Sequence, residues 1–129
     1  MTEPLLVLDQ AAGGSPSEQI AEQLRLQIAA GRLPPGAGLP SVRQLARDLG
    51  IAPNTVVRAY NELERQGWVV AAERRGVAVA NVSAPARQAE RRREVERAVG
   101  RVVVTARRLG VGPAELRAEL DRQLAAQGG

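Results

Sequence analysis

The chain has 129 residues, which is enough for one domain or for a small domain with an appendage. Hydrophobic residues make up 44% of it but aromatic residues only 2%, so a core must rest on Leu, Val, Ile and Ala. Cys and His are both absent, which excludes disulfides, thiol nucleophiles, histidine proton transfer and Cys/His metal sites. No acidic cluster has metal-ligand spacing either, so we expect neither an enzyme nor a bound cofactor.

The charge and hydropathy of the chain further restrict the class of protein to which it can belong. The formal net charge is +4, but residues 1–82 hold eight Arg and eight acidic residues, so the positive charge is not concentrated in that part of the chain. From Val42 to Arg58, however, three Arg are opposed only by Asp48. No apolar run approaches the ~20 residues of a membrane span, and no signal peptide is visible at Met1. We therefore expect a cytoplasmic protein without a membrane partner.

The first expected elements are an N-terminal arm over residues 1–14 and a helix after it. The arm is expected to be mobile, although its strand-like patch, Leu5–Leu8, could instead add an edge strand to a sheet. Residues 15–18, SPSE, combine a Ser cap, a Pro at the first helical position and a Glu three residues after the cap, which together predict a helix start. Gly31 ends this helix, and residues 33–36, LPPG, predict a rigid turn.

Residues 39–68 carry the strongest pattern in the chain. Two short helices are expected there, because apolar residues recur at spacings of three and four on both sides of Gly50. Pro53 stands where the second helix can begin, and Gly67 closes that helix. The first apolar set is Val42, Leu45, Ala46 and Leu49, and the second is Val56, Val57, Tyr60 and Leu63. Two helices around a glycine-containing turn are typical of the helix-turn-helix, whose second helix enters the DNA major groove.

A β-hairpin is expected after these helices. Residues 68–72 and 77–82 are β-prone and are joined by a polar tip, which predicts a hairpin that supplies a wing. The expected fold is therefore mainly α with a small β-hairpin. In it, residues 15–82 form a winged helix-turn-helix, and residues 83–129 form a two-helix C-terminal dimerisation region.

The tail should contain one long Arg/Glu-rich helix to about residue 109 and, after a break, a final helix. The apolar residues of the long helix form a heptad-like seam, and those of the final helix recur every four residues. The two helices cannot bury these residues, together called the stripe, on their own, so a homodimer is expected. The stripe consists of Val95, Val99, Val102, Ala106, Leu109, Leu116, Leu120 and Leu124. By contrast, residues 91–93, all Arg, are accompanied by Glu90, Glu94 and Glu96, which favours a solvated helix face over a contact with flanking phosphates.

Several ordered motifs in residues 16–82 resemble the DNA-binding domain of the GntR family of bacterial transcription regulators. They are the stretches QIAEQLRLQIAAGRLPPGAGLPSVRQLA and AYNELERQGW, the Asn54-Thr55-Val56 turn between them, and a hairpin with Arg75-Gly76. The resemblance implies a winged helix-turn-helix that binds a palindromic double-stranded DNA operator as a homodimer, most often as a repressor. The short helical remainder resembles the YtrA type, which has two small helices in place of a metabolite-binding domain.

Nine residues are candidates for DNA contact: Ser41, Arg43, Arg47, Asn54, Thr55, Val56, Arg58, Arg75 and Gly76. In the resembled family the Arg of the PSxR motif, here Arg43, contacts a guanine edge or a phosphate, both of which match the guanidinium fork. Arg43 could instead be a solvated Arg on an exposed face. Arg47 follows it one turn later. Arg58 could reach bases or phosphates in the groove, or form an ion pair with Glu62 at i+4.

The first turn of the second helix offers N–H groups and a positive dipole end to a phosphate, and the Thr55 hydroxyl can donate to one. Asn54 could cap this helix as well as contact DNA, and Val56 could belong to the core or meet a thymine methyl. At the wing tip, Gly76 permits close backbone approach and Arg75 favours the minor groove, although an ordinary turn is the alternative.

Tyr60 and Trp68 are expected to pack in the core rather than read DNA, because Tyr60 falls on the apolar stripe and Trp68 stands where helix gives way to wing. Two other functions remain open: an architectural DNA-binding protein with little sequence specificity, and a protein-interaction module that has lost its DNA contacts. The sequence does not identify a small-molecule effector, since two short tail helices leave little room for a metabolite pocket.

Overall fold

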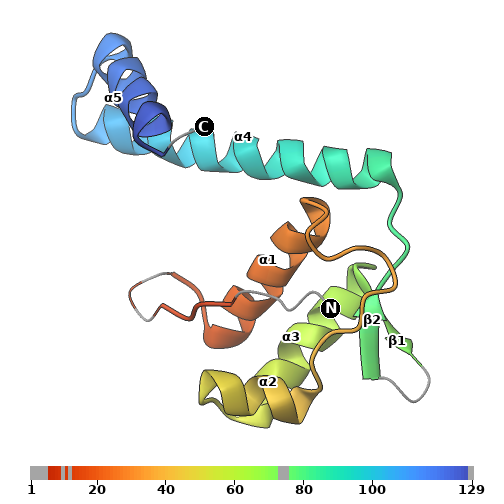
Figure 1. The fold of residues 1–129 in the computed structure, drawn as a ribbon. Coiled ribbons are helices and arrows are strands. Elements are labelled where there is room, and N and C mark those ends of the chain that lie inside the picture. Colours follow the sequence, from red (N-terminus) through yellow and green to blue (C-terminus); the bar gives the residue numbers. More distant parts are fainter. Residues whose placement is uncertain (1–5, 10, 12, 73–75, 128–129) are drawn as a thin grey trace. The chain divides into compact units, whose positions relative to one another are not determined.

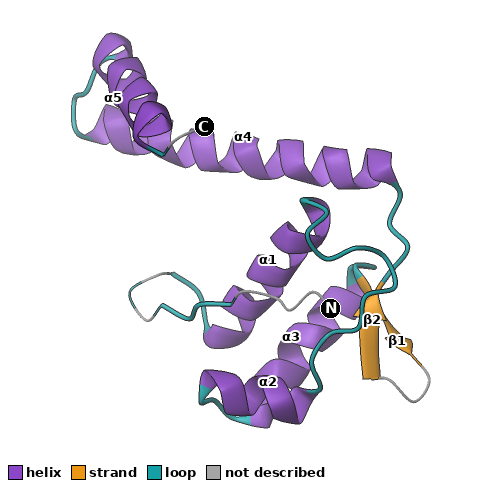
Figure 2. Ribbon diagram, viewed as in Figure 1, coloured by secondary structure: helices purple, strands orange, loops and turns teal. Residues whose placement is uncertain are grey.

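The structure is a computed structural model, and it describes residues 6–9, 11, 13–72 and 76–127. Its elements follow in the order α1 (Pro16–Ala29), α2 (Val42–Leu49), α3 (Pro53–Arg65), β1 (Val69–Ala72), β2 (Gly76–Val79), α4 (Ala84–Arg108) and α5 (Pro113–Ala126) (Figures 1 and 2). The predicted fold class, mainly α with a small β-hairpin, is confirmed. The chain divides into two compact units, Met1–Arg91 and Arg92–Gly129.

The helices of the first unit begin and end at the residues that the sequence marks. Ser15 and Glu18 form a reciprocal capping box at the start of α1, so two otherwise unpaired N–H groups are satisfied. Ser41 caps α2, because its hydroxyl oxygen accepts the backbone N–H of Gln44 at 3.1 Å. Gly50 ends α2 with φ of 67°, a left-handed conformation that suits a residue without Cβ. The short break before α3 is thus fixed by local chemistry.

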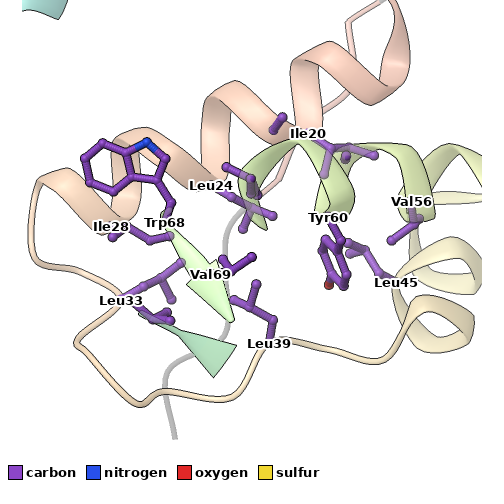
Figure 3. Packing of buried hydrophobic residues seen from close by; sticks show 14 of the residues in the cluster. Ile20, Leu24, Ile28, Leu33, Leu39, Leu45, Val56, Tyr60, Trp68 and Val69 are labelled. Carbon is purple, nitrogen blue, oxygen red and sulfur yellow. The ribbon is translucent and has the colours of Figure 1, made fainter. Parts of the chain in front are cut away.

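An aliphatic core around Tyr60 and Trp68 holds the first unit together (Figure 3). On α1 the buried positions Ile20, Leu24 and Ile28 recur every four residues and form one stripe against α3. The α3 side of the core is formed by Val56, Ala59, Tyr60 and Leu63. Because α2 also packs against α3, the core fixes the helix-turn-helix pair on α1. Tyr60 and Trp68 are 4% and 8% exposed, which confirms their predicted packing role.

The β-hairpin that forms the wing has hydrogen bonds along both edges of its strand β2. β1 pairs antiparallel with β2, with Val69 opposite Val79. On the other edge of β2, residues 36–39 run alongside it like a third strand. There the Leu39 N–H donates to the Val77 carbonyl at 2.9 Å, and the Val79 N–H donates to the Ala37 carbonyl at 2.8 Å. The sequence predicted only a turn in this region, and the pairing places the wing directly against the segment that leads into α2.

The described part of the N-terminal arm lies along α1. The backbone of Val7 exchanges two hydrogen bonds with the side-chain amide of Gln23, at 2.9 and 2.7 Å. The backbone of Asp9 exchanges two more with the amide of Gln19, both at 2.9 Å. Leu6 and Leu8, which alternate with Val7 and Asp9, pack against the core. Residues 6–9 are therefore extended and docked on the helix, and no sheet pairing is involved.

The start of α4 belongs to the first unit, and here one prediction is wrong. Glu90 was expected on a solvated helix face, but it is only 7% exposed and forms an ion pair with Arg25 of α1. The helical pattern around Glu90 could not predict its burial, because its partner Arg25 lies 65 positions earlier in the chain. Glu96 and Arg91–Arg93 are exposed as expected, and Glu94 is half-buried.

Candidate nucleic-acid interface

The α2 side of the candidate interface is positioned by Tyr60. Its hydroxyl donates a hydrogen bond of 2.7 Å to the carbonyl oxygen of Pro40, the residue before the Ser41 cap. Burial raises the pKa of Tyr60 well above its ordinary value, so the hydroxyl keeps its proton and remains a donor. A residue in the middle of α3 thereby fixes the point at which α2 begins.

Arg43 and Arg47 lie one turn apart on α2 and are both exposed. The nearest acid in sequence, Asp48, is occupied, because it accepts a hydrogen bond of 2.7 Å from the side-chain amide of Gln44. Within the described part of the chain, neither Arg has an ion-pair or hydrogen-bond partner. Ser41 is exposed next to them, and its hydroxyl hydrogen is not used by the cap. These three side chains are available to an anionic ligand.

The first turn of α3 is open. Its N-cap residue is Ala52, and no side chain caps the helix. The alternative that Asn54 caps α3 is therefore wrong: Asn54 is the second residue of the helix, exposed, while Thr55 beside it is half-buried. An uncapped N-terminus leaves N–H groups for an external acceptor, and the helix dipole makes that acceptor preferably anionic.

Arg58 is exposed and has no partner among the described residues. The alternative partner, Glu62, is engaged elsewhere, because it accepts from Arg65 and also from Gln66 at 2.7 Å. The hydrogen bond from Arg65 is the main reason that the pKa of Glu62 lies below its ordinary value. The alternative of an i+4 ion pair between Arg58 and Glu62 is thus not seen, because Glu62 pairs with Arg65 at i+3, and the Arg58 guanidinium has no partner among the residues that the structure describes.

Two predicted contacts need separate comment. Val56 is fully buried in the core at 0% exposed, so its proposed contact with a thymine methyl is wrong and its alternative role in packing is correct. Arg75 lies outside the described residues. Gly76, where β2 begins, is exposed and has φ of 77°, a conformation that disfavours any residue with a Cβ.

Taken together, the candidate interface consists of Ser41, Arg43, Arg47, Asn54, Thr55 and Arg58, which come from α2 and the N-terminal half of α3. It offers three guanidinium groups, two hydroxyls, one amide and an uncapped helix end. All of these groups are able to donate hydrogen bonds to phosphate or base acceptors. No group of three metal-ligating side chains lies together in the described ranges, and none of the helices described there is long and apolar enough to cross a membrane.

The second unit presents the apolar stripe to solvent. Of its predicted members only Ala106 is buried, whereas Val95, Val99, Leu109 and Leu124 are 50–72% exposed. Two open grooves, of about 740 and 460 Å³, are lined by residues of α4 and α5 together with the segment between them. Their volumes lie in the range of small-molecule sites, so the tail offers more open space than the sequence suggested. In a single chain this much apolar surface is unusual.

The comparisons with known proteins point to one family. Residues 16–79 match the model of bacterial regulatory proteins of the gntR family. The solved YtrA of Sulfolobus acidocaldarius, a GntR-family transcription factor, is 34% identical, with a TM-score of 0.56 over 74% of this chain and 97% of that one. The chain belongs to the gntR family. Its DNA-binding domain is that of a transcription regulator and not of an enzyme, and its neighbours place it with the YtrA-type members.

Two curated relatives agree with this assignment. An HTH-type transcriptional regulator of Mycobacterium tuberculosis is 51% identical over 59 residues, covering 46% of this chain and 49% of the relative. The HTH-type transcriptional repressor YtrA of Bacillus subtilis is 46% identical over 59 residues, covering 46% of this chain and 45% of the relative. The matches thus span about half the length of these relatives. A GntR-family regulator from Listeria monocytogenes, 22% identical, shares the fold with a TM-score of 0.75 over 89% of this chain and 98% of its own.

Proposed function

We propose that the chain is a sequence-specific regulator that binds a palindromic operator as a homodimer and represses transcription. The observation that carries the proposal is the set of three exposed Arg side chains on the helix-turn-helix, Arg43, Arg47 and Arg58, without a partner among the described residues. Nearby acids are occupied by Gln44 and Arg65, so the guanidinium groups remain available for guanine edges and phosphates.

The homodimer is supported by the apolar stripe of the tail. Val99, Val102 and Leu109 are between 49% and 72% exposed in the single chain, and a second copy would remove them from water. Such a dimer places two recognition helices on half-sites about one helical turn apart, which favours an operator with inverted symmetry. The repressor role is supported by the name of the Bacillus subtilis relative, a transcriptional repressor.

Selection of bound duplexes from a random library tests the proposal directly. We expect an inverted repeat with two half-sites. On the selected operator, Arg58→Ala should weaken binding by ~1–3 kcal/mol and relax the preference at one base position. Arg32→Ala is the matched control, because that Arg is also exposed but lies outside α2 and α3, and it should contribute little. Both variants should unfold at nearly the wild-type temperature.

Two results would overturn the proposal. Selection without an enriched motif would indicate an architectural protein with little sequence specificity. An unchanged ratio between the selected and a scrambled duplex for Arg58→Ala would remove that residue from the recognition surface.

A further inference from the structure

The exposed side of α3 carries a row of polar residues that continues beyond the candidate interface. Residues three and four apart lie on the same side of a helix. Four exposed residues at this spacing form the row: Asn54, Arg58, Asn61 and Arg65. The core residues of α3 occupy the opposite side. The candidate interface includes the first two residues of this row, and Asn61 is the next one along it.

Asn61 and Arg65 differ in what their side chains contact. Arg65 forms an ion pair with Glu62, so its guanidinium is already engaged. Asn61 is exposed and has no hydrogen-bond partner among the residues that the structure describes. Its carboxamide therefore keeps two N–H donors and one acceptor oxygen for an external ligand.

Helix stability does not account for an Asn at position 61. Asn is a poorer helix former than Ala, Glu, Gln or Arg, because its side chain favours helix caps and turns. Asn61 lies well inside α3, between the caps at Ala52 and Gln66, and caps neither end. The amide is thus placed on the exposed side of a recognition helix, where neither the core nor the helix ends use it.

A free carboxamide on a recognition helix has one well-matched target in the major groove. Adenine presents the acceptor N7 beside the donor N6 amino group, so the amide of Asn forms two hydrogen bonds with it at once. Guanine presents two acceptors, which match the guanidinium of Arg58 instead. Asn61 follows Arg58 by a rise of about 4.5 Å along the helix, close to the step of about 3.4 Å between base pairs. Both side chains can therefore address adjacent base pairs.

We propose that Asn61 is a specificity-determining residue that reads an adenine in the major groove, beside the base pair that Arg58 contacts. The inference deepens the proposed function and rests on it, because it requires that α3 enters the groove with this row of residues toward the bases. An amide carries no charge, so it adds little to the attraction for phosphates. Asn61 therefore acts on which sequence is bound, whereas the exposed Arg side chains supply most of the affinity.

The test starts from the operator selected for wild type and replaces each base pair of one half-site in turn. Replacing the A·T pair that Asn61 reads should weaken wild-type binding about tenfold. Asn61→Ala should bind both duplexes equally and keep its preferences at all other positions, with an unchanged salt dependence. Asn81→Ala is the matched control, because that Asn is also exposed in the same unit but lies outside α2 and α3. It should leave every preference intact.

A base analogue tests the contact at the level of single atoms. In 7-deazaadenine a C–H group replaces N7, so the base still pairs with thymine but no longer accepts from the amide N–H. At the position that Asn61 reads, the analogue should weaken wild-type binding about fivefold. It should not weaken the binding of Asn61→Ala, which has already lost this hydrogen bond.

Asn61→Asp provides a second variant with a different expected result. A carboxylate only accepts hydrogen bonds, so the preference at this position should change from adenine to cytosine, whose N4 amino group donates. The added negative charge should lower the affinity for every duplex, and the comparison is therefore made between bases at one position. A residue with a purely structural role would not produce a new preference.

The outcomes separate this inference from the proposed function. If wild type enriches no motif, sequence-specific recognition is wrong, and the role of Asn61 is wrong with it. If wild type enriches an operator but Asn61→Ala keeps every preference, or loses one for a base other than adenine, only the assignment of Asn61 is wrong. Equal weakening on all duplexes would indicate a phosphate contact and would also overturn it. If Asn61→Ala does not fold, an adenine preference retained by Asn61→Asp overturns the assignment.

Discussion

At the scale of single residues, the hydroxyl of Tyr60 links the recognition helix to the start of its neighbour. The chain has one Tyr, and that side chain is 4% exposed with its oxygen 2.7 Å from the Pro40 carbonyl. A hydrogen bond in such surroundings holds Ser41 and Arg43 at a fixed place relative to α3. If the proposed function is correct, this packing residue contributes to DNA recognition without contacting DNA.

Removing this hydroxyl should have a measurable effect on stability. We expect Tyr60→Phe to lower the free energy of unfolding by ~1 kcal/mol, because the Pro40 carbonyl loses its donor while the ring still fills the core. Urea unfolding of both proteins measures the difference. Equal stability together with unchanged DNA affinity would show that the hydrogen bond does not position α2.

The same residue should make stability depend on pH in the alkaline range. Burial raises the pKa of Tyr60, so above the ordinary value of ~10 the unfolded chain releases a proton that the native protein retains. Stability is therefore complete below pH ~10 and falls as pH rises further. Lys and Cys are absent, so few other groups titrate there. Tyr60→Phe should abolish most of the decline, which unfolding at several pH values would show.

At the residue scale, the sequence predicted which side chains are exposed better than it predicted which side chains pair with each other. Arg43 and Arg58 lie off the apolar stripes, and spacing alone placed them correctly on the surface. The choice of partner for Glu62 could not be predicted, because residues at i−4 and i+3 are both within reach on a helix. Which one binds depends on side-chain conformations that the sequence does not determine. The burial of Val56 was likewise left open, since a first-turn residue can face either way.

At the scale of elements, two glycines illustrate opposite roles. Gly50 ends α2 with positive φ, and a Cβ added there would meet nothing within 4 Å. Gly100 lies inside α4 at ordinary helical φ, also with open space where a Cβ would be. The two positions therefore differ in backbone conformation and not in crowding.

This difference predicts effects of opposite sign. Gly50→Ala should destabilise the protein by ~1–2 kcal/mol, because an L-residue in the left-handed region is strained. Gly100→Ala should stabilise α4 by ~0.5–1 kcal/mol, because it restricts the unfolded chain and favours the helix. Denaturant unfolding measures both. A destabilising Gly100→Ala would mean that a neighbouring molecule lies against that position in solution.

Element boundaries were predictable from caps and glycines, whereas pairing between distant elements was not. Residues 36–39 carry no strand pattern, yet they pair with β2 because the turn before them brings their backbone to its open edge. The Arg25–Glu90 contact escaped prediction for the same reason. Periodicity describes one element at a time and contains no information about which face of another element will approach it.

At the scale of the whole molecule, the exposed stripe predicts the oligomeric state. Val99→Asp would place a charge on the surface that a second copy should cover, and burying that charge is unfavourable. We expect wild type to sediment as a dimer at micromolar concentration and Val99→Asp as a monomer, with weaker binding to the full operator. Half-site binding should be preserved, since Val99 lies in the unit without the helix-turn-helix.

The matched control is Val104→Asp. That Val is 46% exposed on the same helix, close to the 50% of Val99, but it does not belong to the stripe. It should remain dimeric. If both variants dissociate, the interface is broader than the stripe, and if neither does, the dimer forms elsewhere.

The backbone of residues 6–9 forms hydrogen bonds with side chains of α1 in a pattern that resembles pairing with a β-strand. Gln19 and Gln23 are one helical turn apart, a rise of about 6 Å, and alternate residues of an extended chain repeat every ~6.6 Å. Because these two repeats nearly match, Gln side chains at every fourth position of a helix can form hydrogen bonds to an extended chain as a neighbouring β-strand would. Hydrogen exchange of the backbone amides should therefore alternate along this segment. It should be slow at Val7 and Asp9, whose N–H groups are bonded to side chains of α1, and fast at Leu6 and Leu8.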